Sequence, residues 1–414
     1  MIASWEAKEA KYIYWGQQVK KWLSVAAVML LCLALVIGVA CGGGGDEEGV
    51  KEVKFGMGLP LSGLFGAVLG VPAKQGLELA NEKVGEFTVA GQSYRWKLIF
   101  EDSRWTGEGG AASTTKLIHE HGVKIMHQLG ADPGFTAQTI CEEAGVLLLT
   151  SAGIDALGPD KHYTFQVMPN SWWNAPPFFR WLSTAHPEVE TVAMVNTDDI
   201  NGRGIADANI AAAEHYGFEV VASEFKPADM VEFYPLATKL VNLNPDLTHV
   251  DPAVLEPMVE MGYENLAYYV LWATSYGEAR GWDNVQSLLI YYPVAVGEGL
   301  PEGVNEFAAE YEARYGLELA QTSYWEAMML YVMTEAVKKA GTVDDVDKII
   351  ATLETETFDT PAGVFQCGGE KIDGSGHVLS WPAWIGEIRG QDYHVIEEIP
   401  ADEAEALAEE VFGK

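Results

Sequence analysis

Three histidines are the residues of this chain whose types and spacing first suggest chemistry. His119, His121 and His127 lie close together in the sequence, as metal ligands often do. His119 and His121 are two positions apart at the end of a predicted helix, so they point to different sides. No cysteine pair and no His-Glu-x-x-His spacing accompanies them. We therefore predict surface histidines and no metal site.

The sequence gives no positive support for catalysis. Ser151 follows a predicted strand, but its surroundings, Thr-Ser-Ala-Gly, lack the glycine that a nucleophile elbow has two residues before the serine. The turn GMGLPLSG, residues 56–63, follows a strand as dinucleotide-binding turns do. Leu61 stands where the third glycine should be, and Pro60 removes a donor amide. We predict no enzyme activity and no cofactor.

Five loops after predicted strands are rich in small and polar residues. In a doubly wound sheet, ligands bind beyond the carboxyl ends of the strands, where loops supply amides and hydroxyls. Each loop taken alone is equally compatible with an ordinary turn. The candidate ligand loops are residues 60–65, 130–134, 151–155, 197–204 and 274–277.

The elements that must position these loops indicate an α/β fold. Strands alternate with helices along the chain, which is typical of parallel sheets covered by helices. In the first half, strands are predicted at 53–58, 94–100, 123–128 and 146–150, and helices at 74–84, 111–121 and 136–144. The alternation restarts after residue 190, and a long helix at 323–340 and a hairpin at 359–381 follow. We predict two lobes, each a doubly wound, mostly parallel sheet.

The segment PNSWWNAPPFF, residues 169–179, places two tryptophans next to the point where the first unit ends. We expect Asn174 to cap a helix that the two prolines open. Trp172 and Trp173 would then precede the helix and face opposite ways. One of the two rings, whichever it is, could pack beneath the crossing from the first unit to the second. The other ring is then a candidate wall for a ligand with an apolar or aromatic body, held by cation–π contact if the ligand is cationic.

Cys41 follows an apolar leader. Lys20 and Lys21 precede the uncharged residues 22–40, and glycines and acidic residues follow Cys41. This pattern is typical of a secretory signal and a flexible tether, although an uncleaved helical anchor or a soluble secreted product would also fit. Gly38-Val39-Ala40-Cys41 resembles the lipobox of bacterial lipoproteins. The resemblance implies a lipidated Cys41 that holds an extracytoplasmic chain at the membrane.

The composition limits the classes of partner. A net charge of −34 argues against nucleic acid, whose binding needs basic surface, and favours high solubility. The roughly 370 residues after the leader exceed one ordinary core, which agrees with two lobes. Cys141 and Cys367 could form a disulfide outside the cell, but we predict two buried free thiols.

Several short stretches, in order, resemble the leucine/isoleucine/valine-type solute-binding proteins of ABC importers. They are residues 55–63, 75–80, 98–102, 165–169, 215–221, 243–246, 357–365 and 372–377. The resemblance covers nearly everything from residue 53 to about residue 396. It implies a two-lobed periplasmic-binding-protein type I fold, whose interlobe cleft closes by hinge motion around the ligand.

The resemblance also implies where the parts of the chain begin and end. The three crossings between the lobes are expected near residues 166–170, 292–295 and 379–381. The expected parts are a signal peptide 1–40, a lipidated tether 41–52, a first lobe 53–168 and 293–379, and a second lobe 169–292 and 380–414.

Relatives of this type hold an amino acid's carboxylate and ammonium with hydroxyls and amides from three loops. Three departures argue against an aliphatic amino acid here: Asp132 lies where relatives have a serine, Gly153 and Ile154 lie near a usual threonine, and Asn201 replaces a tyrosine. An anion would be repelled by Asp132 unless that side chain turns away. The predicted ligand-binding residues are Ser62, Leu64, Phe65, Gly130, Ala131, Asp132, Ser151, Ala152, Gly153, Trp172, Trp173, Asn201, Thr274 and Tyr276.

The resulting functional prediction is a lipid-anchored, monomeric solute-binding protein outside the cytoplasm. It captures an amino-acid-like, carboxylate or amide ligand and delivers it to an ABC permease. Two other classes stay open. A ligand-sensing receptor module of the same fold would need a transmembrane helix and an output domain, and an exported enzyme would need a catalytic set.

Overall fold

The structure is a computed structural model that describes residues 49–227, 229–269, 281, 283, 285, 288–292 and 297–414. The predicted leader and Cys41 therefore lie outside the described residues. Within the described ranges, no helix is both long enough and apolar enough to cross a membrane.

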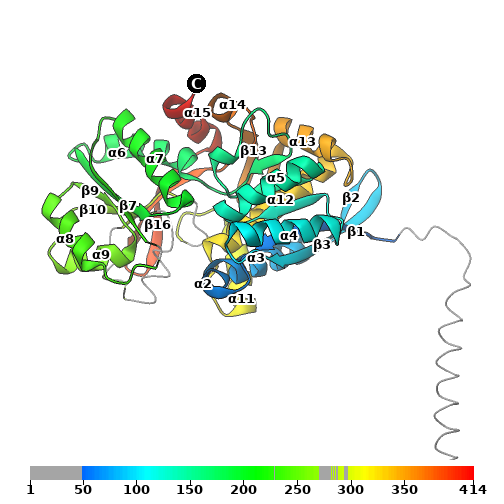
Figure 1. The fold of residues 1–414 in the computed structure, drawn as a ribbon, viewed down its shortest axis with the longest axis horizontal. Helices are drawn as coiled ribbons and strands as arrows, with labels where there is room; N and C mark the ends of the chain where they lie inside the picture. The colour runs from blue at the N-terminus through cyan, green and yellow to red at the C-terminus, as the bar shows by residue number, and fades with distance from the viewer. Residues whose placement is uncertain are drawn as a thin grey trace, which may run out of the picture. The chain divides into compact units, whose positions relative to one another are not determined.

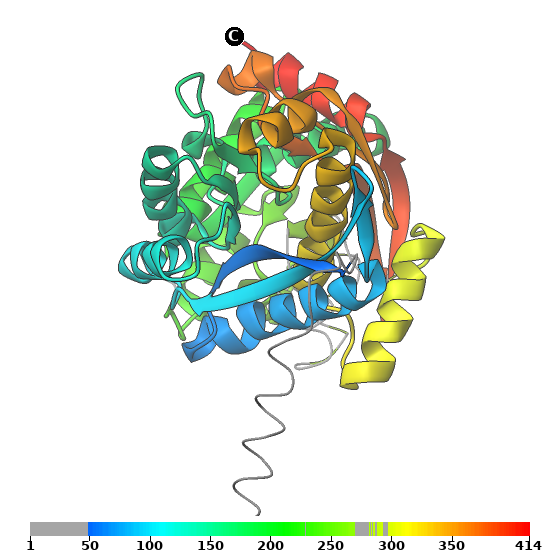
Figure 2. The ribbon, with the colours of Figure 1, turned by 90° about the vertical axis from the view of Figure 1, so that its right-hand side faces the viewer.

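The first sheet contains β1 (Lys51–Leu59), β2 (Phe87–Val89), β3 (Gln92–Asp102), β4 (Ile125–Gln128), β5 (Leu147–Thr150), β6 (Thr164–Gln166), β12 (Thr357–Thr360), β13 (Gly363–Gly368) and β14 (Val378–Ser380). Their order is β12-β13-β14-β6-β5-β4-β1-β3-β2. From β3 to β6 all neighbours are parallel, and β1 runs beside β3 over its whole length (Figure 2). The hairpins β2–β3 and β12–β13 form the two antiparallel edges.

The second sheet contains β7 (Thr191–Thr197), β8 (Glu219–Lys226), β9 (Leu247–His249), β10 (Leu266–Tyr269), β11 (Leu289–Ile290), β15 (Ala383–Arg389) and β16 (Asp392–Ile399). Its order is β16-β15-β11-β10-β9-β7-β8. The strands from β8 to β11 are parallel, and β15 and β16 add an antiparallel edge (Figure 1).

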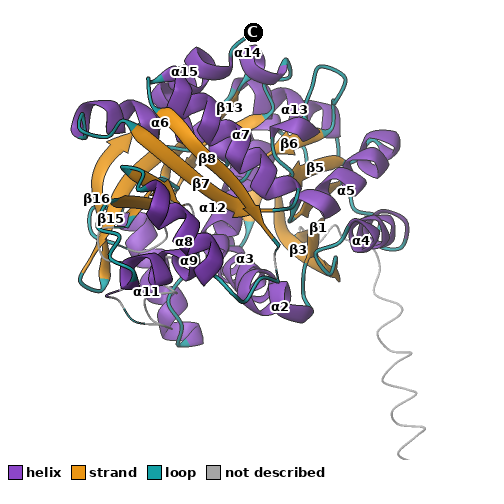
Figure 3. Cartoon of the chain, turned by 60° about the vertical axis from the view of Figure 1, so that its left-hand side comes forward, coloured by secondary structure: helices purple, strands orange, loops and turns teal. Residues whose placement is uncertain are grey.

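Helices cover both sheets (Figure 3). They are α2 (Gly63–Phe65), the π-helix η1 (Gly66–Gly70), α3 (Val71–Val84), α4 (Gly107–His119), α5 (Ala131–Ala144), the 3-10 helix η2 (Ile154–Ala156), α6 (Ser171–Ala185), α7 (Ile200–His215), α8 (Tyr234–Leu243), α9 (Pro252–Glu260), α11 (Glu302–Tyr315), α12 (Gln321–Ala340), α13 (Val346–Thr355), α14 (Glu370–Asp373) and α15 (Ala401–Phe412). α3 packs against α12, α4 against α5, and α6 against both α7 and α15. Two mostly parallel sheets flanked by helices confirm the predicted α/β fold class.

Among the described strands, the chain passes from one sheet to the other after β6, after β11 and after β14. The first and last passages are tied together, because the Trp381 indole Nε1–H donates to the Val167 carbonyl at 2.9 Å. Trp381 is buried and packs edge-on against Phe365. Most of the expected middle crossing, residues 292–295, lies outside the described residues.

The predicted hairpin at residues 359–381 is only partly right. β12 and β13 form a hairpin, but the short helix α14 follows, and β14 then pairs in parallel with β6. Gly369 and Gly374 flank α14 with φ values of 94° and 85°. Glycine adopts this left-handed conformation without a steric penalty, so the chain can turn into and out of the helix.

The predicted start of α6 is wrong. Asn170, not Asn174, caps the helix, because its side chain accepts a hydrogen bond from the Trp173 amide at 3.1 Å. Trp172 and Trp173 consequently lie in the first helical turn instead of before the helix. Asn170 satisfies an amide that has no partner inside the helix, which is what makes it the cap.

Candidate functional site

The carboxyl ends of the first sheet's parallel strands lie side by side. Strand register aligns Leu59 with Asp102, Gln128 with Thr150, and Thr150 with Gln166. The predicted loops at 60–65, 130–134 and 151–155 therefore leave the sheet at one edge, as expected for a ligand-binding edge.

Gly130 and Ser151 join two of these loops. The Gly130 amide donates to the Ser151 Oγ at 2.7 Å. Gly130 has a φ of 101° and caps α5 without a side chain, so the amides of Ala131 and Asp132 open the helix. Amides in the first turn of a helix have no partner within that helix and attract negative groups. The Asp132 side chain is exposed.

Gln166 holds the third loop. Its Oε1 accepts from the Gly153 amide at 2.9 Å, and its Nε2 donates to the Met168 carbonyl at 2.9 Å. The Ala152 amide donates to the Thr150 hydroxyl at 3.1 Å. The Ser151–Gly153 loop is thus fixed by the end of β6, where the chain leaves the first sheet.

Asp102, at the end of β3, connects the loop that follows β1 to the loop that follows β3. Its Oδ1 accepts from the amides of Leu61 at 2.8 Å and Arg104 at 2.9 Å. Burial by itself would raise the pKa of Asp102. Hydrogen bonds from the Ser62 side chain and the two amides outweigh burial and hold the pKa below its usual range.

Phe65 stacks on a ring that the sequence did not single out. The centroids of Phe65 and Trp105 are 4.9 Å apart with an angle of 20° between the rings. Both side chains are half-buried. A Cβ on Gly130 would lie 2.9 Å from Cζ3 of Trp105, so this indole borders the start of α5. The predicted residue Leu64 lies in α2.

The corresponding edge of the second sheet already uses its acidic side chains as helix caps. Asp199 accepts from the Gly202 amide at 2.7 Å at the start of α7. Asp251 caps α9 and lies 2.9 Å from Nζ of Lys226. Asn201 is exposed in the first turn of α7. The predicted residues Thr274 and Tyr276 lie outside the described residues.

Comparison with known proteins identifies the family to which this chain belongs. A family model described as "Periplasmic binding protein" matches residues 52–392. The chain belongs to this family. Its members bind solutes, so membership confirms the prediction that the chain is not an enzyme, and it supports an extracytoplasmic location. The resemblance inferred from the sequence is likewise confirmed at the level of the family.

Solved structures agree on the fold. An ABC transporter substrate-binding protein from Sphaerobacter thermophilus has a TM-score of 0.74 at 18% identity, covering 85% of this chain and 98% of its own. A leucine binding protein from Thermotoga maritima has a TM-score of 0.70 at 17% identity, with coverages of 84% and 99%. A solute binding protein of R. palustris in complex with benzoate has a TM-score of 0.70 at 16% identity, with coverages of 85% and 97%. None of the curated proteins matches the chain.

The two predicted tryptophans of this periplasmic binding protein lie away from the first sheet's loops just described. Trp172 packs edge-on against Phe412 of α15, with centroids 4.5 Å apart. Trp173 is 1% exposed and belongs to the core. Both positions follow from the earlier helix start at Asn170, which winds the two residues onto α6.

The three histidines do not form a cluster. His119 is exposed, and His121 pairs with Glu101 at 3.1 Å. The prediction of a surface residue is wrong for His127, which is fully buried on β4, 2.9 Å from the equally buried Glu326 of α12. β4 is covered on both sides, so a polar residue on it needs a buried partner. The described residues contain no group suited to hold a metal ion.

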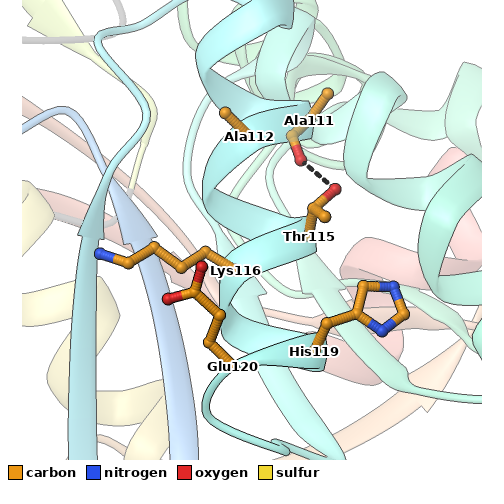
Figure 4. A pocket seen from close by; sticks show the side chains of 6 residues that line it. All are labelled: Ala111, Ala112, Thr115, Lys116, His119 and Glu120. Atoms are coloured by element: carbon orange, nitrogen blue, oxygen red, sulfur yellow. Dashed lines mark hydrogen bonds between the residues drawn. The ribbon is translucent and has the colours of Figure 1, made fainter.

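A shallow hollow on α4 also involves a predicted histidine (Figure 4). It is lined by Ala111, Ala112, Thr115, Lys116, His119 and Glu120. Thr115 donates to the Ala111 carbonyl, and Lys116 lies 2.7 Å from Glu101. These polar groups are engaged within the protein, and nothing in the hollow converges on a ligand.

Cys141 and Cys367 are free thiols, as predicted, but only Cys141 is fully buried. Burial raises the pKa of the Cys141 thiol, with a smaller contribution from the charge of Glu142.

Sequence reasoning missed Asp102, Trp105 and Gln166 at the site. Their only available signal was their place at or just beyond the ends of predicted strands.

Proposed function

We propose that this protein captures a small solute between its two lobes and delivers it to an ABC importer. The observation that carries the proposal is the edge where Gly130–Asp132 and Ser151–Gly153 meet, held by the Gly130–Ser151 hydrogen bond. Two amides at the start of α5 face a position beyond the strand ends, the place where open α/β sheets bind ligands.

The proposed ligand carries an acceptor group for these amides, such as a carboxylate or an amide oxygen. The solved relatives named above include a leucine binding protein and a protein in complex with benzoate, and leucine and benzoate each contain a carboxylate. Asp132 opposes an anion at this position, so the ligand's charged group must be oriented toward the amides and away from that side chain.

The remaining parts of the proposal concern the whole chain. Residues 53–168 and 293–379 form the first lobe, residues 169–292 and 380–414 the second, and the ligand closes them by contacting both. Asn201, Thr274 and Tyr276 are the second lobe's proposed contributors, whereas Trp172 packs against Phe412 and Trp173 belongs to the core. A lipid on Cys41 holds the monomer at the membrane beside its permease.

The test is a ligand screen on the purified protein. Leucine, benzoate, glutamine and related amino acids, carboxylates and amides are tested by thermal shift, since a ligand that binds only the folded state raises the melting temperature. We expect a hit that calorimetry shows to bind one-to-one, a smaller radius of gyration with ligand, and recovery of unaltered ligand. Chemical conversion of a hit, or no shift with any compound, would refute the proposal.

A further inference from the structure

The C-terminal helix α15 contacts elements that belong to both sheets (Figure 1). It follows β16 of the second sheet and packs against α6 and α7, which flank that sheet. It also packs against β14 of the first sheet and against α14, which precedes that strand. The family model ends at residue 392, so α15 lies beyond the matched part of the chain.

Two side-chain contacts attach α15 to the helices of the second sheet. The Phe412 ring packs edge-on against Trp172 of α6. Oε1 of Glu410 lies 3.0 Å from Nε2 of His215, the last residue of α7. Connectivity and packing therefore make α15 part of the second lobe.

Glu405 attaches the same helix to the first sheet. Its Oε1 accepts from the Gly369 amide at 3.0 Å, at the start of α14, and the Ser380 hydroxyl of β14 lies 3.4 Å from Oε2. A Cβ on Gly368 would lie 2.0 Å from Oε1 of Glu405, so the carboxyl group occupies the space that a side chain there would need. Glu405 is half-buried, and a hydrogen bond from an amide to a carboxylate is stronger than one between neutral groups.

Two further contacts join α15 to α14. Nζ of Lys371 lies 2.5 Å from Oε2 of Glu409, and the Lys414 amide donates to the Lys371 carbonyl at 2.9 Å. Trp173 of α6 reaches the same turn, because a Cβ on Gly369 would lie 3.3 Å from its Cζ3. The short helix α14 of the first lobe is thus held by α6 and α15 of the second.

The contacts between α14 and α15 border a hollow. Lys371, Glu405 and Glu409 line it, together with Gly369 and with Glu354 of α13. Polar contacts beside a hollow separate without exposing a large apolar surface, which is the costly step in opening a packed core. The seam between α14 and α15 can therefore part when the lobes move, and its contacts bias that movement.

We propose that α15 is a clasp whose contacts with α14 hold the two lobes in one arrangement. Glu405, Glu409 and Lys414 make these contacts, and their loss lets the lobes take up other arrangements. A clasp lowers the free energy only of the arrangement in which its contacts are made, so it biases the hinge without touching the ligand. The proposal rests on the two lobes of the proposed function and not on the identity of the ligand.

Single-molecule energy transfer on the ligand-free full chain tests the clasp. Dyes are attached through unnatural amino acids at His119 of α4 and Asp207 of α7, which are both exposed, so that the native thiols stay unlabelled. We expect one narrow distribution of transfer efficiency for the wild type. Glu405→Ala should widen it at least twofold. Glu405→Gln, which keeps an acceptor for the Gly369 amide, should stay close to the wild type.

Two variants probe the clasp from α14 and the strand before it. Gly368→Ala places a methyl group where the Glu405 carboxyl group lies, so it should widen the distribution as Glu405→Ala does. Lys371→Ala should have a smaller effect, because an ion pair with a largely exposed lysine contributes little. Glu403→Ala is the matched control: it makes the same change at an exposed position of α15 and should leave the distribution unchanged.

Three outcomes would overturn the clasp. They are a wild-type distribution as broad as that of Glu405→Ala, wild-type distributions in both Glu405→Ala and Gly368→Ala, and equal widening by Glu403→Ala. Melting temperatures establish that each variant is folded, and Gly368→Ala decides the matter if Glu405→Ala is not. Because no ligand is used, a failed clasp leaves the solute-binding proposal standing, and a failed ligand screen leaves the clasp standing.

Discussion

A buried contact between His127 and Glu326 is the clearest residue-scale feature outside the site. His127 Nδ1 lies 2.9 Å from the Leu149 carbonyl and Nε2 lies 2.9 Å from Glu326, and both side chains are fully buried. Such a pair links β4 in the sheet to the long helix α12. Desolvation offsets much of the attraction within a buried pair, but loss of one partner leaves the other uncompensated.

We expect His127→Ala to lower the free energy of unfolding by about 3–5 kcal/mol, because it leaves the buried Glu326 carboxyl group without its partner. The double variant His127→Leu/Glu326→Leu should recover most of that loss. Urea titration measures both. A double variant as unstable as the single one would show that the contact itself stabilises the fold, and that the loss is not caused by the carboxyl group left without a partner.

His249 on β9 predicts a pH dependence. Burial lowers its pKa to about 3, against a smaller opposing hydrogen bond with Val195. The unfolded chain takes up a proton at this residue below about pH 6.5, but the folded protein does not do so until about pH 3. Stability should therefore fall as the pH decreases through this window.

His249→Phe keeps a ring against Tyr268, whose centroid is 4.8 Å from that of the histidine. Between pH 6.5 and pH 4 we expect the variant to lose about 2–3 kcal/mol less stability than the wild type. Chemical denaturation across this range measures the difference. His119→Gln, at an exposed histidine, is the control and should follow the wild type.

At the scale of elements, the cap of α6 decides where two tryptophans lie. Asn170→Ala removes the acceptor for the Trp173 amide, so we expect a loss of about 1 kcal/mol. Asn170→Ser, which retains a capping oxygen, should lose much less. Thermal unfolding compares the variants, and equal losses in both would show that the asparagine acts by packing instead of by capping.

At the scale of the whole molecule, the proposed anchor depends on a single residue. Cys41→Ser should prevent lipidation and leave a longer precursor, and globomycin should make the wild type accumulate at the same length. Membrane fractionation and electrophoresis measure both effects. An unchanged size and membrane partition under both treatments would exclude the lipoprotein model in favour of a helical anchor or a secreted chain.

The alternation of strands and helices was readable from the sequence because each element's apolar pattern is local. The strands at the carboxyl edge of the first sheet were also predictable as ligand positions, since parallel strands end together. Gly130 and Ser151 fell on those predicted loops, and the structure joins them by a hydrogen bond. Periodicity thus determined the fold class and the two lobes, and the rule that parallel strands end together indicated the edge at which we propose that the ligand binds.

Tertiary structure alone decided what the side chains at that edge do. Trp105 reaches Phe65 and Gly130 because Asp102 ties two loops that lie about forty residues apart in the sequence. His127 is buried because α12, nearly two hundred residues later, covers its strand and supplies Glu326. No local pattern encodes contacts of this range, since they depend on how separate elements pack. The sequence alone therefore determined the architecture, whereas packing decided the chemistry within it.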